Sequence, residues 1–254
     1  MASLVLDLNK RYTYADYLTW TDDKMRELID GFIRLSPAPK LKHQKISGII
    51  FVNLFKIIEN SKGKCEVFHA PFDVRRPENG EKADEQIYNV VQPDICMVCD
   101  SSKLDENGCI GAPDLIVEVL SKSSERRDAI EKKALYEKAG VKEYWIVYPN
   151  DEIIYVYILL NEKYEYHNVY GVDDKIPVHM LNGYVICYAG TCATDNSLIF
   201  VENFLLKIRW KKKKYCIFAK NYQEHFYQDE KYRKHIKRTT GEQTITFESG
   251  CCFP

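Results

Sequence analysis

The segment APDLIVEVLSKSSERRD, residues 112 to 128, joins a strongly apolar run to the polar start of a helix. Five of the six side chains from Leu115 to Leu120 are apolar, which predicts a strand buried on both faces. Glu118 stands inside this run, and a buried carboxylate without a partner is strongly destabilising. Glu118 is therefore expected either to meet a neutralising partner or to bind a ligand.

The composition of the chain is typical of an ordinary soluble protein. Charged residues make up 29% and aromatic residues 13% of the 254 residues, which excludes neither an enzyme nor a binding protein. The sequence has no run of eighteen apolar residues, and its start, MASLVLDLNKRYTY, lacks the basic-then-apolar order of a secretory signal. We therefore expect a cytoplasmic protein without a membrane partner.

The cysteines do not form a recognisable framework. Their number, nine, is odd and their spacing is irregular, which predicts reduced and mostly buried thiols. Cys96 and Cys99 form a CxxC motif, but they lie in an apolar strand, where positions three apart point to opposite faces. A zinc or redox site is therefore not expected there.

Charge and patterning divide the chain near residue 190. Residues 201 to 254 contain twelve Lys and Arg but six Asp and Glu, although the whole chain carries a formal charge of −1. The hydrophobic pattern also degrades beyond about Gly190. We expect a domain over residues 1–190 and a basic C-terminal extension over 191–254. This extension, with its stretch KIRWKKKKYCIFAK, is either disordered and solvated, helical, or a binder of phosphates.

The apolar periodicity predicts helices and strands in the order expected of a mixed sheet with helices on its faces. The predicted helices cover residues 14–20, 43–59 and 124–140, the last ending at Gly140. The predicted strands cover 26–30 and 32–37, which form a hairpin, and then 65–77, 88–100, 114–121, 143–149, 152–160, 164–171 and 176–181. The fold class is therefore α/β, in the broad sense that includes α+β, with extra β-hairpins.

A partner for Glu118 must come from another strand. Asp114 lies four residues away on the same strand, about 13 Å along it, so one ion bound at about 2.1 Å cannot join the two carboxylates. If residues 92–100 pair antiparallel with 113–121, and residues whose numbers sum to 212 stand opposite each other, Asp94 faces Glu118. Cys96 then faces Ile116 in the adjacent apolar layer.

Two carboxylates in an apolar setting suit a hard divalent cation, most simply Mg²⁺ or Mn²⁺. Cleavage of a phosphoester also needs a group that orients water or stabilises charge, commonly a lysine. Asp128, Lys132 and Tyr136 are spaced four apart on one helix face, so Lys132 can turn toward Asp94 and Glu118. The structural alternatives are a turn at Pro93–Asp94 and a surface ion pair between Asp128 and Lys132.

Several motifs taken together resemble the Uma-type restriction endonucleases of the PD-(D/E)XK nuclease superfamily, over about residues 10 to 187. They are ELIDG (27–31), His43, QPDICMV (92–98), APDLIVEVLS (112–121), Asp128, Lys132, LYEKAGVKEYWIVYP (135–149) and IPVHMLNG (176–183). The resemblance implies a restriction-endonuclease-like core, a mixed four-stranded sheet flanked by helices, and metal-dependent hydrolysis of DNA.

The resemblance also assigns roles to residues. It implies that Asp94 and Glu118 are catalytic residues that bind the metal and that Lys132 is the catalytic lysine. The wider superfamily places this lysine two residues after the acid, where this chain has Leu120. Family members relocate the lysine to the following helix, and Lys122 and Lys133 are the alternatives to Lys132. Glu27, His43, Asp114 and Asp128 match recurrent positions and are candidate accessory residues, although Asp114 is first expected to be a structural residue at the strand entry.

These observations predict a Mg²⁺- or Mn²⁺-dependent endodeoxyribonuclease whose partner is DNA. Because residues 1–200 are net acidic, local basic groups must contact DNA, namely Arg75, Arg76, Lys122, Arg126, Arg127 and the lysine-rich tail. Nucleases of this fold often pair to cut two strands, so a homodimer is also compatible. The alternatives are a catalytically inactive nucleic-acid-binding or interaction protein that keeps the fold, and a degenerate or aberrantly extended gene product.

Overall fold

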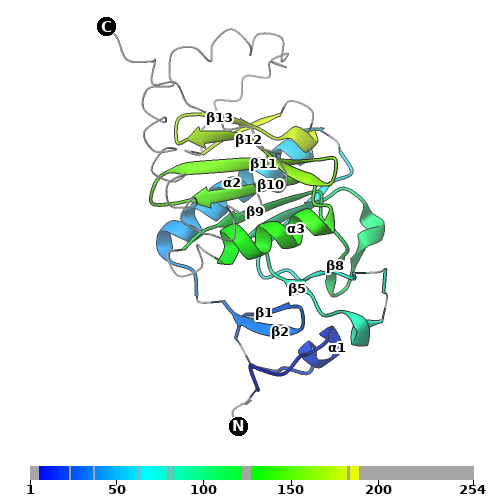
Figure 1. Ribbon diagram of the computed structural model, residues 1–254. Coiled ribbons are helices and arrows are strands. Elements are labelled where there is room, and N and C mark those ends of the chain that lie inside the picture. The colour runs from blue at the N-terminus through cyan, green and yellow to red at the C-terminus, as the bar shows by residue number, and fades with distance from the viewer. Residues whose placement is uncertain are drawn as a thin grey trace, which may run out of the picture. The chain divides into compact units, whose positions relative to one another are not determined.

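The computed structural model describes residues 6–22, 24–36, 38–61, 63–78, 80–81, 83–121, 127–181 and 184–188 (Figure 1). The predicted extension over residues 191–254 lies outside this part of the chain. Within the described part, none of the helices combines the length and apolar character that crossing a membrane requires.

A six-stranded mixed sheet forms the centre of the described chain (Figure 1). Its strands, in spatial order, are β12 (Lys163–Gly171), β11 (Ile153–Leu160), β10 (Glu143–Tyr148), β9 (Leu115–Val119), β6 (Ile95–Val98) and β3 (Glu66–His69). β9 and β10 are parallel, and every other neighbouring pair is antiparallel. The central strands are the apolar runs of the sequence, which is typical of strands covered on both faces.

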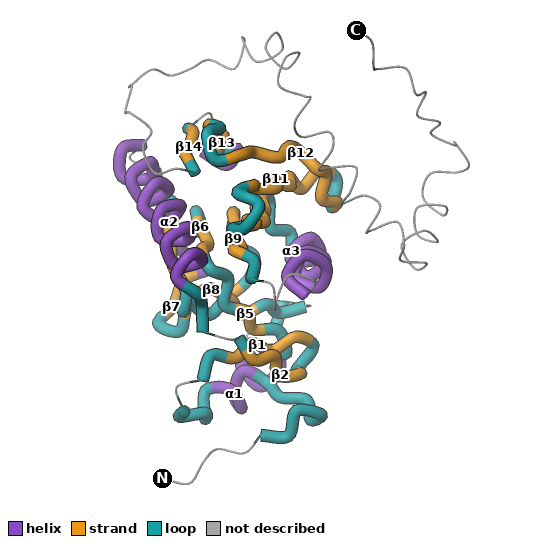
Figure 2. Tube along the Cα trace, turned by 90° about the vertical axis from the view of Figure 1, so that its left-hand side faces the viewer, coloured by secondary structure: helices purple, strands orange, loops and turns teal. Residues whose placement is uncertain are grey.

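Helices cover the two faces of this sheet. Helix α2 (Leu41–Ser61) lies on one face, and helix α3 (Lys133–Ala139), preceded by the π-helical turn η3 (Arg127–Lys132), lies on the other (Figure 2). The side chains at 46, 50, 54 and 58 of α2 are spaced to face the sheet, where they join the main apolar core. Gly140 ends α3 with φ 87°, the left-handed conformation that favours glycine. The predicted fold, a mixed sheet flanked by helices with additional hairpins, is confirmed.

A second six-stranded sheet holds the N-terminal hairpin. In spatial order it comprises β2 (Phe32–Leu35), β1 (Arg26–Ile29), β5 (Val90–Val91), β4 (Val74–Arg75), β8 (Gly108–Ile110) and β7 (Leu104–Asp105). The short helix α1 (Tyr14–Tyr17) contributes to a smaller apolar core beside it. The turn at Gly31 has φ 82°, so the predicted hairpin is confirmed.

The remaining elements are short. They are the helical turns η1 (Asp84–Gln86), η2 (Ser101–Lys103) and η4 (His179–Leu181), and the paired strands β13 (Lys175–Pro177) and β14 (Val185–Cys187). The predicted strand over 88–100 is divided into β5 and β6 by Gln92–Asp94, because Pro93 cannot donate to a sheet ladder.

The prediction of reduced cysteines is wrong at Cys65, Cys99 and Cys187, which are disulfide-bonded. Cys65 and Cys99 form a disulfide, because the register that pairs Glu66 with Val98 also places position 65 opposite position 99. Cys96 and Cys109 are free and buried, as predicted. Burial is the main reason that the pKa of the Cys96 thiol is raised, so this thiol is protonated at neutral pH.

Candidate active site

The strands that carry Asp94 and Glu118 pair in the predicted register. β6 and β9 are antiparallel, with Ile95 opposite Val117 and Cys96 opposite Ile116. Continued by one residue, this register places position 94 opposite position 118. Positions directly opposite each other in a pair of strands lie on the same face of the sheet.

Asp94 is fixed by two contacts to one carboxylate oxygen. Its Oδ2 accepts a hydrogen bond from the backbone N–H of Val119 at 2.7 Å and lies 3.1 Å from His43 Nε2. A carboxylate can only accept, so Nε2 of His43 carries the proton in this contact. The Asp94 side chain is 20% exposed, which leaves part of the carboxyl group open to solvent. The first turn of α2 thus brings a candidate accessory residue, His43, to the predicted metal ligand.

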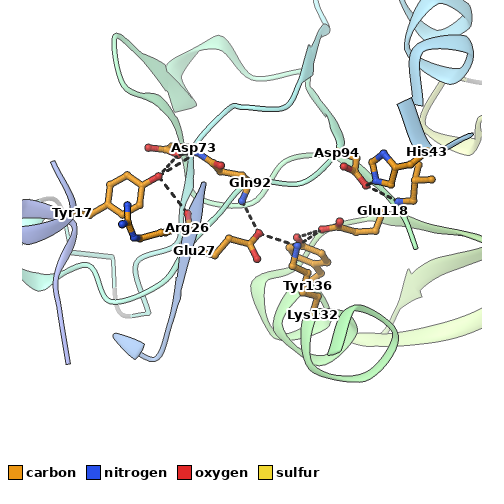
Figure 3. A network of polar contacts seen from close by, with 11 residues as sticks. Tyr17, Arg26, Glu27, His43, Asp73, Gln92, Asp94, Glu118, Lys132 and Tyr136 are labelled. Atoms are coloured by element: carbon orange, nitrogen blue, oxygen red, sulfur yellow. Dashed lines mark hydrogen bonds and ion pairs between the residues drawn. The ribbon is translucent and has the colours of Figure 1, made fainter. Parts of the chain in front are cut away.

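Glu118 meets a lysine and a tyrosine. Its Oε1 lies 3.0 Å from Lys132 Nζ and accepts a hydrogen bond from the Tyr136 hydroxyl at 2.7 Å. Burial, followed by the charge of Glu118, raises the pKa of Tyr136 well above its ordinary value, so its hydroxyl stays protonated and donates. The neighbour that the buried carboxylate requires is therefore Lys132, and the side chains of Lys132 and Tyr136 both reach Glu118 (Figure 3).

Within the described part of the chain, Lys132 contacts a second acid besides Glu118. Its Nζ also lies 2.8 Å from Glu27 Oε1, and the side chains of Lys132 and Glu27 are 4% and 1% exposed. Glu27 comes from β1, in the second sheet, and the same Oε1 accepts the backbone N–H of Gln92 at 2.9 Å. The predicted accessory residue Glu27 therefore reaches the site through Lys132.

The polar network continues beyond Gln92 to a half-buried acid (Figure 3). The Gln92 side-chain Nε2 donates to Asp73 Oδ1 at 2.8 Å, and the hydroxyls of Tyr14 and Tyr17 each donate to Asp73 at 3.4 Å. Burial is the main cause of the raised pKa of Asp73. The sequence reasoning did not identify Asp73 or Gln92 as part of the site, and the only signal was the position of Gln92 in the QPD motif.

Asp114, a predicted accessory residue, has other contacts than these. Asp114 Oδ2 accepts the backbone N–H of Cys99 at 2.8 Å and its Oδ1 lies 2.7 Å from Lys142 Nζ, so Asp114 is structural at the strand entry. Asp128 lies in η3, and its side chain is outside the described part of the chain.

The expectation that Arg75 and Arg76 contact DNA is wrong. Both are buried, at 3% and 6% exposure. Arg75 pairs with Asp105, and Arg76 donates to the backbone carbonyl of Leu135 at 2.8 Å. Lys122, Arg126 and the side chain of Arg127 lie outside the described part of the chain.

The chemistry of the donors fits a hard divalent cation. Carboxylate oxygens are what Mg²⁺ and Mn²⁺ prefer, and Asp94 is partly open to solvent. Among the described residues, no group of three or more His, Cys, Asp or Glu gathers as a metal site. A Mg²⁺ site that uses substrate phosphate and water needs only one or two carboxylates, so Asp94 and Glu118 are sufficient in number.

Comparisons with known proteins show the family and the fold of the chain. The sequence profile of the Uma2 family, described as "Putative restriction endonuclease", matches residues 14–186. A solved structure with a similar fold is a "putative nuclease belonging to DUF820" from Anabaena variabilis ATCC 29413, with a TM-score of 0.55 and 20% sequence identity. The match covers 70% of this chain and 96% of that chain. A search of curated proteins gave no match. The matched profile spans both sheets and every residue of the candidate site, so the chain belongs to the Uma2 family of nuclease-type proteins.

Proposed function

We propose that this protein is a metal-dependent endodeoxyribonuclease that hydrolyses DNA phosphodiester bonds. The proposal is supported by the register of β6 and β9 and by the ion pair of Glu118 with Lys132. Continued by one residue beyond Ile95 and Val117, this register has position 94 opposite position 118, and Lys132 lies 3.0 Å from Glu118. Two carboxylates that bind a metal ion and one ammonium group are sufficient functional groups for metal-assisted phosphoester hydrolysis. Asp94 and Glu118 would hold Mg²⁺ or Mn²⁺.

The chain's own groups have distinct roles in this proposal. A bound divalent ion would polarise the scissile phosphate and lower the pKa of the attacking water. His43 and the Val119 N–H hold the Asp94 carboxylate in one orientation before substrate arrives. The Lys132 ammonium stabilises negative charge that develops on the phosphate, or orients the attacking water. Its burial strengthens either effect because the surroundings screen charge weakly.

Binding of DNA requires basic groups other than Arg75 and Arg76. The predicted contacts from Lys122, Arg126, Arg127 and the basic extension remain part of the proposal. Cutting both strands of DNA with one active site on each would need a second copy of the chain. This homodimer remains a prediction from the family resemblance.

A plasmid-nicking assay tests the proposal. Wild-type protein with Mg²⁺ or Mn²⁺ is expected to convert supercoiled plasmid to nicked or linear forms, and Glu118→Gln is expected to abolish the conversion. Glu66→Gln, an exposed position on β3, is a matched control that should cleave like wild type. Absence of cleavage with any divalent ion, together with salt-sensitive DNA binding, would instead support the catalytically inactive nucleic-acid-binding protein.

A further inference from the structure

Glu27 joins two segments of the active site that the sequence separates widely. A single oxygen atom, Glu27 Oε1, lies 2.8 Å from Lys132 Nζ and 2.9 Å from the backbone nitrogen of Gln92. Lys132 belongs to η3, and Gln92 lies two residues before Asp94. We propose that Glu27 is a positioning residue that fixes Lys132 and the Asp94 segment relative to each other, an inference that rests on the proposed nuclease function.

Burial makes this contact specific. The Glu27 side chain is 1% exposed and that of Lys132 is 4% exposed, so water cannot easily replace either partner. A buried pair of this kind tolerates little variation in geometry, since losing one partner leaves an uncompensated charge. The flexible lysine side chain is therefore held by Glu27 as well as by Glu118.

Glu118 alone is a poor anchor for Lys132 during catalysis. In the proposed function the Glu118 carboxylate also serves the divalent ion, so its attraction for the ammonium is shared. In the proposed function, Glu27 does not bind the divalent ion. Its other oxygen, Oε2, is buried and has no hydrogen-bond partner in the described part of the chain, so it can accept the ammonium if Nζ shifts. Glu27 therefore keeps the lysine in the site when Glu118 is engaged elsewhere.

Gln92, the second residue that Glu27 contacts, is also held by hydrogen bonds of its own side chain. The Gln92 side chain donates from Nε2 to Asp73 Oδ1 at 2.8 Å and to the Tyr17 hydroxyl at 3.2 Å. These bonds hold residue 92 while its backbone N–H points at Glu27 (Figure 3). Pro93 has a fixed φ and restricts the backbone of Gln92 before it. Holding Gln92 in place therefore also limits the position of Asp94.

Kinetics of Glu27→Gln test the positioning role. This variant keeps the size of the side chain but removes the charge that holds Lys132. We expect kcat to fall about 10- to 100-fold while KM stays within about twofold of wild type, as for other residues that orient catalytic groups. Glu143→Gln is the matched control, because Glu143 is also a buried strand glutamate but contacts Trp145 and Met180 instead. A wild-type kcat in Glu27→Gln, or a change in KM alone, would overturn the proposal.

A spectroscopic measurement on the metal-free protein separates this inference from the nuclease function. In ¹⁵N-lysine NMR spectra, the Lys132 ammonium should give a slowly exchanging signal, assigned by its loss in Lys132→Arg. The signal should disappear or broaden in Glu27→Gln and persist in Glu143→Gln. If Glu27→Gln does not fold, Glu27→Asp, which keeps the charge but shortens its reach, should show the same loss.

The Lys132 NMR signal tests the positioning role of Glu27, and DNA cleavage tests the nuclease function. An unchanged Lys132 signal in the folded Glu27 variant refutes the positioning role even if the wild type cleaves DNA. A lost signal supports the role even if no cleavage is found, in which case only the nuclease function fails.

Discussion

Glu118 and Lys132 form a buried ion pair, with Lys132 Nζ 3.0 Å from Glu118 Oε1 and both side chains 4% exposed. The acid comes from the central strand β9 and the lysine from the helical turn that follows it. Each charge is tolerated in the interior because the other is present. Substitutions of these two residues are therefore expected to change both the function of the site and the stability of the fold.

The first prediction concerns this coupling. Lys132→Met leaves Glu118 and Glu27 buried without the ammonium, so the free energy of unfolding should fall by about 3–5 kcal/mol. Urea denaturation at pH 7 measures it. Lys138→Met is the control, because Lys138 is 70% exposed and its pair with Glu78 should contribute at most about 1 kcal/mol. Equal losses in the two variants would contradict the coupling.

The second prediction concerns His43. Because His43 Nε2 holds Asp94 Oδ2 at 3.1 Å, His43→Ala should weaken binding of Mn²⁺ about tenfold or more without abolishing it. Calorimetric titration of the metal-free protein measures the Kd. His167→Ala, at an exposed position on β12, should bind Mn²⁺ like wild type. Wild-type affinity in His43→Ala would show that Asp94 does not need this contact.

The third prediction concerns pH and lies outside the site. Burial raises the pKa of Glu143 to about 7 from an ordinary value near 4.5. Between these values the folded protein keeps a proton that the unfolded chain releases, so this residue lowers stability as pH rises through that window. Across this window, the contribution of Glu143 to the free energy of unfolding falls by about 3 kcal/mol. Unfolding of wild type and Glu143→Gln at pH 5 and pH 8 should show a steeper loss in wild type, and parallel pH dependences would refute this assignment.

The sequence predicted the register of β6 and β9 because two patterns determine it. The alternation of side chains along a strand sets which residues share a face, and the length of the connection restricts the register. The pairing of Cys96 with Ile116 is the confirmed consequence. The four-residue spacing in a helix likewise placed Lys132 and Tyr136 on one face, and both contact Glu118.

Contacts between distant segments could not be predicted in this way. The Glu27–Lys132 pair joins two sheets, and no local period reports such a contact. The same limitation explains the error at Arg75, since charge in a sequence does not reveal burial against Asp105 and Tyr14. The hairpin of β7 and β8 was missed because strands of two and three residues are too short to show alternation.

The most direct test of the account is calorimetric titration of the metal-free protein with Mn²⁺, which asks whether Asp94 and Glu118 bind one ion together. We predict one site in wild type that is lost in both Asp94→Asn and Glu118→Gln but kept in Glu66→Gln. Binding that survives both site substitutions, or no binding in a folded wild-type protein, would contradict it.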